Sequence, residues 1–271
     1  MIVGRRDLLR CVGLAAAGSR VRKLIAQTQP DQIPDQIEDL VLASRILADH
    51  GILDAYGHVS VRSDRDAQHF FMSRSLAPVL VTRADILEYD LDCNVIGGTK
   101  ENLFLERFIH GEMYRARPDV RAVVHCHTPS LIPFGDTDVQ LRPMFGLAGF
   151  LAAGVPVFEI RRSFGETDLL VRDAARGRAL AQTLGNKPVA LMRGHGAVVT
   201  GASLPLAVGR CIYLDLDARV QKETIALGGK NITYLTAQEG RQSVADDYRR
   251  AWELWRREAL AKMNSTTPAQ Q

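Results

Sequence analysis

The sequence predicts an α/β fold in which a mixed, mainly antiparallel sheet is flanked by helices. Strand-like and helix-like segments alternate along the chain. The strand-like segments alternate apolar and polar residues, as half-buried strands do, and the others have a helical period. The glycine-rich loops that join parallel βαβ units do not recur between them. The chain has 271 residues, of which 46% are hydrophobic and 24% charged, so it can form one sizeable folded domain. We assign that domain to residues 31–271 and treat residues 1–30 as a leader.

The first half of this domain predicts two helices and three strands. Residues 35–50 carry apolar side chains at helical spacing and stop before a glycine, so we expect an amphipathic helix there. Residues 58–62 (HVSVR) alternate as a strand, and residues 69–73 (HFFMS) follow across a polar turn as its partner. Residues 85–98 predict a further strand and its turn. Residues 105–116 have helical period and are closed by a proline.

The next segments predict strands that alternate with shorter helices. Residues 120–127 (VRAVVHCH) form an apolar run typical of a buried strand, and residues 130–134 begin a short helix. Residues 155–160 (VPVFEI) predict another strand, and residues 167–184 predict a helix that ends at a glycine. Residues 188–201 (PVALMRGHGAVVTG) predict two strands joined by a tight Gly-His-Gly turn.

Two long helices are expected at the end of the chain, over residues 204–227 and 243–263. Trp252 and Trp255 lie three positions apart on the second one, which favours a stripe in the core or at an interface. Tyr213, on the first one, is expected in the core.

The leader differs in charge from the rest of the chain. The formal net charge is +3, and the basic excess falls within residues 1–30, so the body is near neutral and has no basic footprint for nucleic acid. Arg5 and Arg6, followed by a short apolar run, resemble a twin-arginine export signal, although later basic residues interrupt that run. Functional export and a basic extension therefore both stay open. No later stretch is apolar and long enough to predict a membrane span.

Two histidines at the end of the apolar strand predict a metal site. His125 and His127 are two positions apart, so both imidazoles project from one face and can reach one ion. Cys126 between them points to the opposite face, where we expect a small core residue. His195, between two glycines that permit close approach, is a third imidazole, and Glu106 offers a carboxylate. Catalytic zinc sites commonly use three protein ligands and leave one position open.

These residues stand in motifs that resemble the class II aldolase/adducin superfamily. The family pattern has a Glu with a His four residues on, here Glu106 and His110. Next comes Y-x-x-x-P-D-V-x-A-V-V-H-x-H, here YRARPDVRAVVHCH, and then a histidine–glycine motif, here MRGHGAVVTG. The likeness covers roughly residues 36–240. It implies a three-layer α/β/α sandwich, one divalent metal ion, and a homo-oligomer, usually a tetramer with its sites at subunit interfaces.

By motif match, the resemblance implies that His125, His127 and His195 hold the metal, with Glu106 as a fourth ligand or as an acid/base. Such a ligand set suits zinc, manganese, iron and cobalt alike, and magnesium stays open as well, so the metal is not distinguished. Most relatives work in the cytoplasm. We therefore expect a cytoplasmic protein, with periplasmic export by a degenerate twin-arginine signal as the alternative.

The substrate loops depart from those of the sugar-phosphate members of the family. Where those members carry Asn, Gly and two serines in loops that cradle phosphate, this sequence has His58, Arg74, Phe104 and Leu105. The loss of hydroxyls and the gain of an arginine argue against phosphate. They favour a partly apolar small-molecule carboxylate as substrate, because a guanidinium matches a carboxylate in shape and charge.

Candidate roles follow from these departures. Ser73 and Arg74 are expected to bind a substrate carboxylate, and His58 and His110 to act as polar catalytic groups near the substrate. Arg161 and its neighbour Arg162 are expected to be solvated. Each of these positions also has an ordinary structural interpretation, such as a surface turn for Arg74 or helix packing for His110.

The pattern looks like the decarboxylase branch of the superfamily, with its hydroxy-carboxymuconic semialdehyde and pyridine-dicarboxylate decarboxylases. A metal ion that polarises a carbonyl stabilises the enolate left when an adjacent carbon–carbon bond breaks. We therefore predict a divalent-metal-dependent decarboxylase of a hydroxy- or oxo-dicarboxylate from aromatic or heteroaromatic catabolism. The alternative is a metal-dependent aldolase acting on a non-phosphorylated carboxylate substrate. Oxidative decarboxylation, as in an iron-dependent branch, and an adducin-like scaffold are the remaining alternatives.

Overall fold

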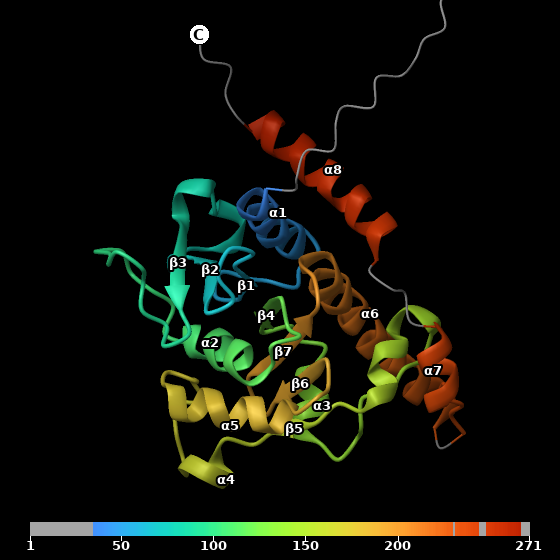
Figure 1. Cartoon of the computed structure of the whole chain (residues 1–271). Helices are drawn as coiled ribbons and strands as arrows, with labels where there is room; N and C mark the ends of the chain where they lie inside the picture. Colours follow the sequence, from blue (N-terminus) through green and yellow to red (C-terminus); the bar gives the residue numbers. More distant parts are fainter. Residues whose placement is uncertain (1–34, 230, 244–247, 267–271) are drawn as a thin grey trace, which may run out of the picture. The chain divides into compact units, whose positions relative to one another are not determined.

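A computed structural model describes residues 35–229, 231–243 and 248–266 of the chain. The leader assigned to residues 1–30, with its twin-arginine motif, lies outside the described residues. The described part forms a sheet covered by helices on both faces (Figure 1). No helix within it is apolar over enough residues to cross a membrane.

The sheet has seven strands in the order β3-β2-β1-β4-β7-β6-β5. Every neighbouring pair is antiparallel except β5 with β6, which is parallel. The predicted mixed, mainly antiparallel sheet is therefore confirmed. The strands are β1 His58–Arg62, β2 His69–Ser73, β3 Ile86–Asp90, β4 Ala122–Cys126, β5 Val157–Phe158, β6 Val189–Met192 and β7 Gly196–Gly201.

Helices form the two outer layers. On one face, α1 Gln36–Asp49, α6 Leu204–Gly228 and α8 Arg249–Thr266 pack in one apolar cluster with the sheet. On the other face, α2 Arg107–Ala116 and α5 Ala174–Leu184 lie side by side (Figure 1). The shorter helices are η1 Pro78–Leu80, η2 Arg83–Asp85, α3 Ile132–Asp136, η3 Gly146–Ala153, α4 Arg161–Phe164 and α7 Ala237–Ser243.

The central strand β4 divides its residues between the two layers by simple alternation. Val124 and Cys126 belong to the cluster with α1 and α6, whereas Val123 belongs to the cluster with α2 and α5. Cys126 is a buried core residue, as predicted. His125 shares the face of Val123, so its imidazole lies on the α2 side of the sheet, where the site forms.

Several boundaries differ from the sequence prediction. The helix expected over residues 167–184 begins at Ala174, because the side chain of Asp173 accepts a hydrogen bond from the amide of Arg176 and caps it. The strand expected over residues 155–160 has two residues, β5. The sequence prediction missed η3 and α7, and the last helix begins at Arg249 rather than at residue 243.

The last helix, α8, packs against α1 through aromatic and charged contacts. Trp252 and Trp255 are buried in the core between these helices, which confirms the core interpretation. Arg256 pairs with Asp39 of α1 at 3.1 Å. Tyr213 of α6 packs against the same cluster and stacks on Tyr248 with ring centroids 5.1 Å apart.

Candidate metal centre

Four side chains from three separate parts of the chain meet at the end of β4. They are Glu106, immediately before α2, His125 and His127 at the end of β4, and His195 in the turn between β6 and β7. One donor atom from each lies within 4.8 Å of all the others. The Nε2 atoms of His125 and His127 are 3.0 Å apart, and Oε2 of Glu106 is 3.4 Å from Nε2 of His125 and 3.3 Å from Nε2 of His195. The predicted cluster is therefore brought together.

The outer contacts of His125 and His195 turn their Nε2 atoms toward the centre of this cluster. Nδ1 of His125 lies 3.1 Å from the carbonyl oxygen of Ala197, and Nδ1 of His195 lies 3.1 Å from that of Leu169. A carbonyl only accepts, so both Nδ1 atoms carry a proton, and both Nε2 atoms are left to bind either a proton or a metal ion. Nδ1 of His127 lies 3.6 Å from Oδ1 of Asp54, within reach of an ion pair but too far for a hydrogen bond.

The electrostatics of the cluster suit a divalent cation. Burial, with the neighbouring His125 and His195, lowers the pKa of His127 to about 4. Burial alone raises the pKa of the Glu106 carboxyl, but His125 and His195 lower it to well below its usual range. Neutral imidazole nitrogens and a carboxylate oxygen are ligands of zinc and similar ions. These four donor atoms converge on one point, where a divalent cation can take the place of the protons, so the donor set fits a metal ion.

Close approach of the backbone brings His195 to the other ligands. A Cβ atom at Gly196 would lie 2.0 Å from the carbonyl oxygen of Cys126, so only glycine lets the start of β7 pack against the end of β4. Gly194 has a φ of +63°, and its amide donates to the Asp136 carboxylate at 2.7 Å. The glycines that flank His195 are therefore structural requirements of the site.

The irregular residues 167–173 hold two of the ligands. The amide of Val171 donates to Oε1 of Glu106 at 2.9 Å, which leaves Oε2 for the centre. Leu169, whose carbonyl accepts from His195, has a φ of +67°, an uncommon value for a residue with a side chain. A helix over these residues, as expected from the sequence, would remove both contacts. Sequence reasoning missed Asp54, Leu169 and Val171, and no local motif marks them.

Next to the metal cluster, a buried chain of hydrogen bonds leads from β1 into α2. Nδ1 of His58 is 2.6 Å from Nε2 of His110, Oγ of Ser60 is 2.6 Å from Nδ1 of His110, and the same Oγ is 2.7 Å from the hydroxyl of Tyr114. His58 is the strand neighbour of His125. Burial lowers the pKa of His110 to about 3 and holds that of His58 well below its usual value, so both rings are neutral. Ser60 and Tyr114 were not singled out from the sequence.

A cavity of about 790 Å³ opens beside the metal cluster. His58, Glu106 and His127 line it, whereas His110 is fully buried behind His58 and does not. The lining that the structure describes contains no lysine or arginine. Its other members are Ala55, Tyr56, Ser75, Leu76, Ala77, Leu80, Leu103, Phe104, Leu105 and Leu170.

The structure does not bring the expected carboxylate-binding residues to this cavity. Arg74 is held by Asp85 at 2.7 Å and approaches Glu101 at 3.6 Å, so its charge is engaged within the chain. Ser73 is buried at the end of β2 and does not line the cavity either. Arg161 is exposed and pairs with Glu159, in line with a solvated position.

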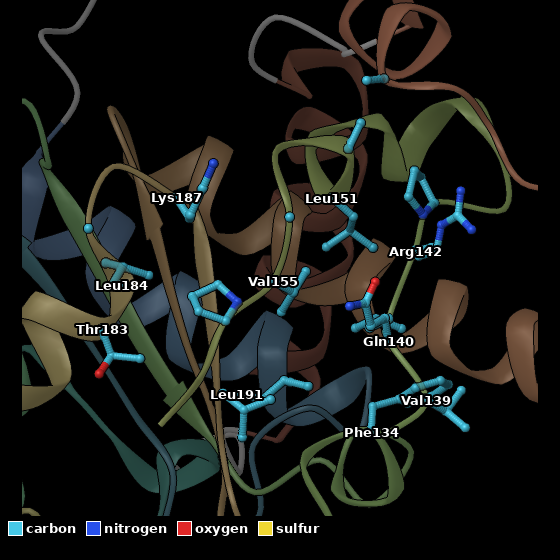
Figure 2. A pocket seen from close by; sticks show the side chains of 18 of the residues that line it. Phe134, Val139, Gln140, Arg142, Leu151, Val155, Thr183, Leu184, Lys187 and Leu191 are labelled. Carbon is cyan, nitrogen blue, oxygen red and sulfur yellow. The ribbon is translucent and has the colours of Figure 1, made fainter. Parts of the chain in front are cut away.

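A second cavity, of about 770 Å³, lies among the loops after α3 and η3 and the end of α5. Figure 2 shows the apolar side chains of Leu151, Val155 and Leu191 between Lys187 on one side and Arg142 on the other. None of the four metal-cluster residues lines it.

The sequence is similar to those of two decarboxylases. The chain is 35% identical over 254 residues to the decarboxylase tropJ of Talaromyces stipitatus, covering 84% of this chain and 95% of that protein. It is 30% identical over 207 residues to the 3,4-dihydroxyphthalate decarboxylase of Arthrobacter keyseri, covering 71% of this chain and 79% of that protein.

Solved structures share the fold. An aldolase II superfamily protein from Pseudomonas syringae superposes with a TM-score of 0.72 at 21% identity, over 87% of this chain and 96% of the other. The L-fuculose 1-phosphate aldolase of Glaciozyma antarctica superposes with a TM-score of 0.71 at 20% identity, over 88% and 96%. The family model of the class II aldolase and adducin N-terminal domain matches residues 38–222. With its predicted three-layer fold confirmed, the chain belongs to the class II aldolase and adducin family.

Proposed function

We propose that this protein is a divalent-metal-dependent decarboxylase of a hydroxy- or oxo-dicarboxylate derived from an aromatic or heteroaromatic ring. The observation that carries the proposal is the opening of the cluster of Glu106, His125, His127 and His195 onto a largely apolar cavity. Such a lining suits a planar, partly apolar molecule better than a sugar phosphate. The names of the two relatives support decarboxylation, and one of them names a ring with two carboxylates and two hydroxyls.

Each group has a stated role in this proposal. A bound divalent cation supplies a Lewis acid that stabilises the negative charge developing as CO₂ leaves. Glu106 is held by the amide of Val171, so its carboxylate is oriented as a fourth ligand. His58 contacts the substrate from the cavity wall, and His110 acts through His58. Phe104, which packs on His58 with ring centroids 4.5 Å apart, excludes water from that wall.

The test combines metal analysis with a product assay. Purified protein is loaded with zinc, manganese, magnesium, iron or cobalt, and CO₂ release is followed over a panel of ring-derived dicarboxylates that includes 3,4-dihydroxyphthalate. We expect release that stops on chelation and in His195→Ala but persists in His69→Ala, a half-exposed histidine outside the cluster. Release that survives chelation contradicts the proposal. An aldehyde product without CO₂ would favour the aldolase alternative on a non-phosphorylated carboxylate.

We also propose a homotetramer with the cavity mouth at a subunit interface. Three residues that line the cavity, Tyr56, Leu80 and Leu105, are apolar or aromatic and are 72%, 59% and 58% exposed. A second subunit would bury them. Light scattering that gives a monomer at working concentration contradicts this assembly. A cytoplasmic location is proposed with it, and fractionation of cells expressing the full chain tests it against periplasmic export.

A further inference from the structure

The direction of every hydrogen bond in the chain from Tyr114 to His58 follows from counting protons. At the inner end, the buried hydroxyl of Tyr114 lies 2.7 Å from Oγ of Ser60, and it makes no other hydrogen bond among the described residues. The phenol proton therefore has one acceptor, Oγ of Ser60, and Tyr114 donates to it.

Ser60 then has one proton of its own to place. Its other partner is Nδ1 of His110 at 2.6 Å, and both groups are fully buried. If Nδ1 of His110 carried a proton, the serine proton would have no acceptor in this network, which burial makes costly. Ser60 therefore donates, and Nδ1 of His110 is the unprotonated nitrogen.

A neutral imidazole carries its proton on one nitrogen only, so His110 carries it on Nε2. Nε2 of His110 lies 2.6 Å from Nδ1 of His58, so His110 donates and Nδ1 of His58 accepts. The proton of His58 consequently resides on Nε2. This Nε2 atom takes no part in the series of hydrogen bonds from Tyr114, and the ring of His58 lines the cavity beside the metal cluster.

The Nε2–H group of His58 lies beside a cavity that offers few other groups to bind an anionic oxygen. No lysine or arginine lines the described part of the cavity, and Arg74 is engaged by Asp85. An Nε2 atom that carries a proton cannot bind a metal ion, although the ring of His58 lies 5.2 Å from that of His125. The remaining use of this group is to donate a hydrogen bond.

We propose that Tyr114, Ser60 and His110 lock His58 in its Nε2–H form, so that His58 donates a hydrogen bond to an anionic oxygen of the substrate and is not a metal ligand. Ser60, Tyr114 and His110 are then positioning residues, and His58 is the one that contacts the substrate. The substrate part rests on the proposed function, whereas the proton positions do not.

Nitrogen NMR of the zinc-loaded full chain tests the proton positions without any turnover. Protein labelled with ¹⁵N at histidine is sedimented for solid-state measurement, and the His58 and His110 signals are identified by their loss in His58→Gln and His110→Gln. We expect both rings to be neutral with protonated Nε2 and unprotonated Nδ1. A protonated Nδ1 at His58 overturns the proposal, whether or not the protein releases CO₂.

Kinetics of the active dicarboxylate from the panel test the role of the N–H. In Ser60→Ala, His110 loses its donor and His58 is no longer held in one form, so we expect KM to rise by about threefold to tenfold. Ser60→Thr retains the hydroxyl and should restore KM. Thr200→Val, which removes another buried hydroxyl from the same sheet, is the matched control and should leave KM unchanged. An unchanged KM in Ser60→Ala, with the NMR signal of His58 altered, overturns the substrate contact.

Discussion

Nδ1 of His195 donates to the main-chain carbonyl of Leu169 at 3.1 Å, and Leu169 itself is held at a φ of +67°. A residue with a side chain rarely adopts this conformation, which costs about 1–2 kcal/mol. This backbone conformation directs the carbonyl of Leu169 at Nδ1 of His195, which leaves Nε2 of that ring for the metal centre. A main-chain group far from the ligands in sequence therefore helps to define the site.

The first prediction concerns this carbonyl. Leu169→Ile places a β-branched side chain at positive φ, where it is strained, and should shift the carbonyl away from His195. Losing such an outer contact typically weakens metal binding by about tenfold or more. Leu169→Met keeps an unbranched side chain of similar size and is the control. Zinc affinity by competition with a chelator checks this, and equal affinity in both variants would show that the contact is dispensable.

The second prediction separates the two glycines beside His195. Gly196→Ala forces a methyl group to within 2.0 Å of the Cys126 carbonyl oxygen, so β4 and β7 must move apart. Gly194→Ala has open space, with its nearest neighbour at 3.6 Å, and suffers only from its φ of +63°. We expect Gly194→Ala to lower the free energy of unfolding by about 1 kcal/mol and Gly196→Ala by at least about 3 kcal/mol, as in other severe backbone clashes. Denaturant unfolding measures both, and a reversed order would be inconsistent with the packing described.

The metal ligands were accessible from the sequence because their signals are local. The two-residue period of a strand puts His125 and His127 on one face whatever lies around them. The glycines beside His195 indicate that the backbone packs closely against another group there, but they do not identify that group. The family motif joined the three histidines with Glu106, and the fold brings these four together.

What the sequence did not disclose depends on contacts between distant segments. Arg74 looked like a substrate ligand, but Asp85, eleven positions away, engages it. The period of residues 167–184 favours a helix throughout, yet Val171 and Leu169 are drawn out of it by Glu106 and His195. The pattern of side chains in a segment predicts which secondary structure the segment prefers. It does not predict the hydrogen bonds that residues distant in sequence form with the backbone of that segment.

The third prediction is that zinc stabilises the fold through these ligands. An ion that binds only the folded state raises its stability by about 2.7 kcal/mol at a hundredfold excess over Kd. His127→Ala removes one of the ligands and should abolish the rise in Tm on adding zinc. The variant should still fold, because 23% of the His127 side chain is exposed and the fold depends on it little. His69→Ala should retain the rise. Calorimetry with and without zinc checks this, and a Tm rise that persists in His127→Ala would place the ion elsewhere.

The fourth prediction concerns Asp217, a fully buried carboxyl on α6. Its Oδ1 accepts from the amide of Met144 at 2.8 Å, while Oδ2 has no partner among the described residues. Burial raises the pKa of Asp217 to about 7 from its usual 3.8. The folded state therefore retains a proton that the unfolded chain has already lost, and the free energy of unfolding falls as pH rises from about 4 to about 7.

Asp217→Asn removes that titration and keeps an acceptor for Met144. In the parent, titration of Asp217 should lower the free energy of unfolding by about 4 kcal/mol between about pH 4 and about pH 7, given a pKa shift of this size. We expect Asp217→Asn to lack this decrease. Above about pH 7 it should be more stable than the parent. Asp138→Asn, at an exposed position, is the control and should follow the parent. Parallel pH profiles of unfolding for the parent and Asp217→Asn would contradict a proton on Asp217.

The last prediction concerns the apolar wall of the cavity, where the ring of Phe104 packs on His58 and is 8% exposed. Phe104→Ser restores a hydroxyl at a position where sugar-phosphate members of the family carry one, but His58 and Leu105 remain. Removing the ring should raise KM for a ring-derived dicarboxylate by about tenfold or more, because about 1.5–3 kcal/mol of apolar contact is lost. It should not create activity on a sugar phosphate. Val155→Ser, in the second cavity, makes a similar change away from the site and should leave KM unchanged. Steady-state kinetics on both substrate classes decide the point, since a gain on the phosphate substrate would mean that Phe104 alone sets the specificity.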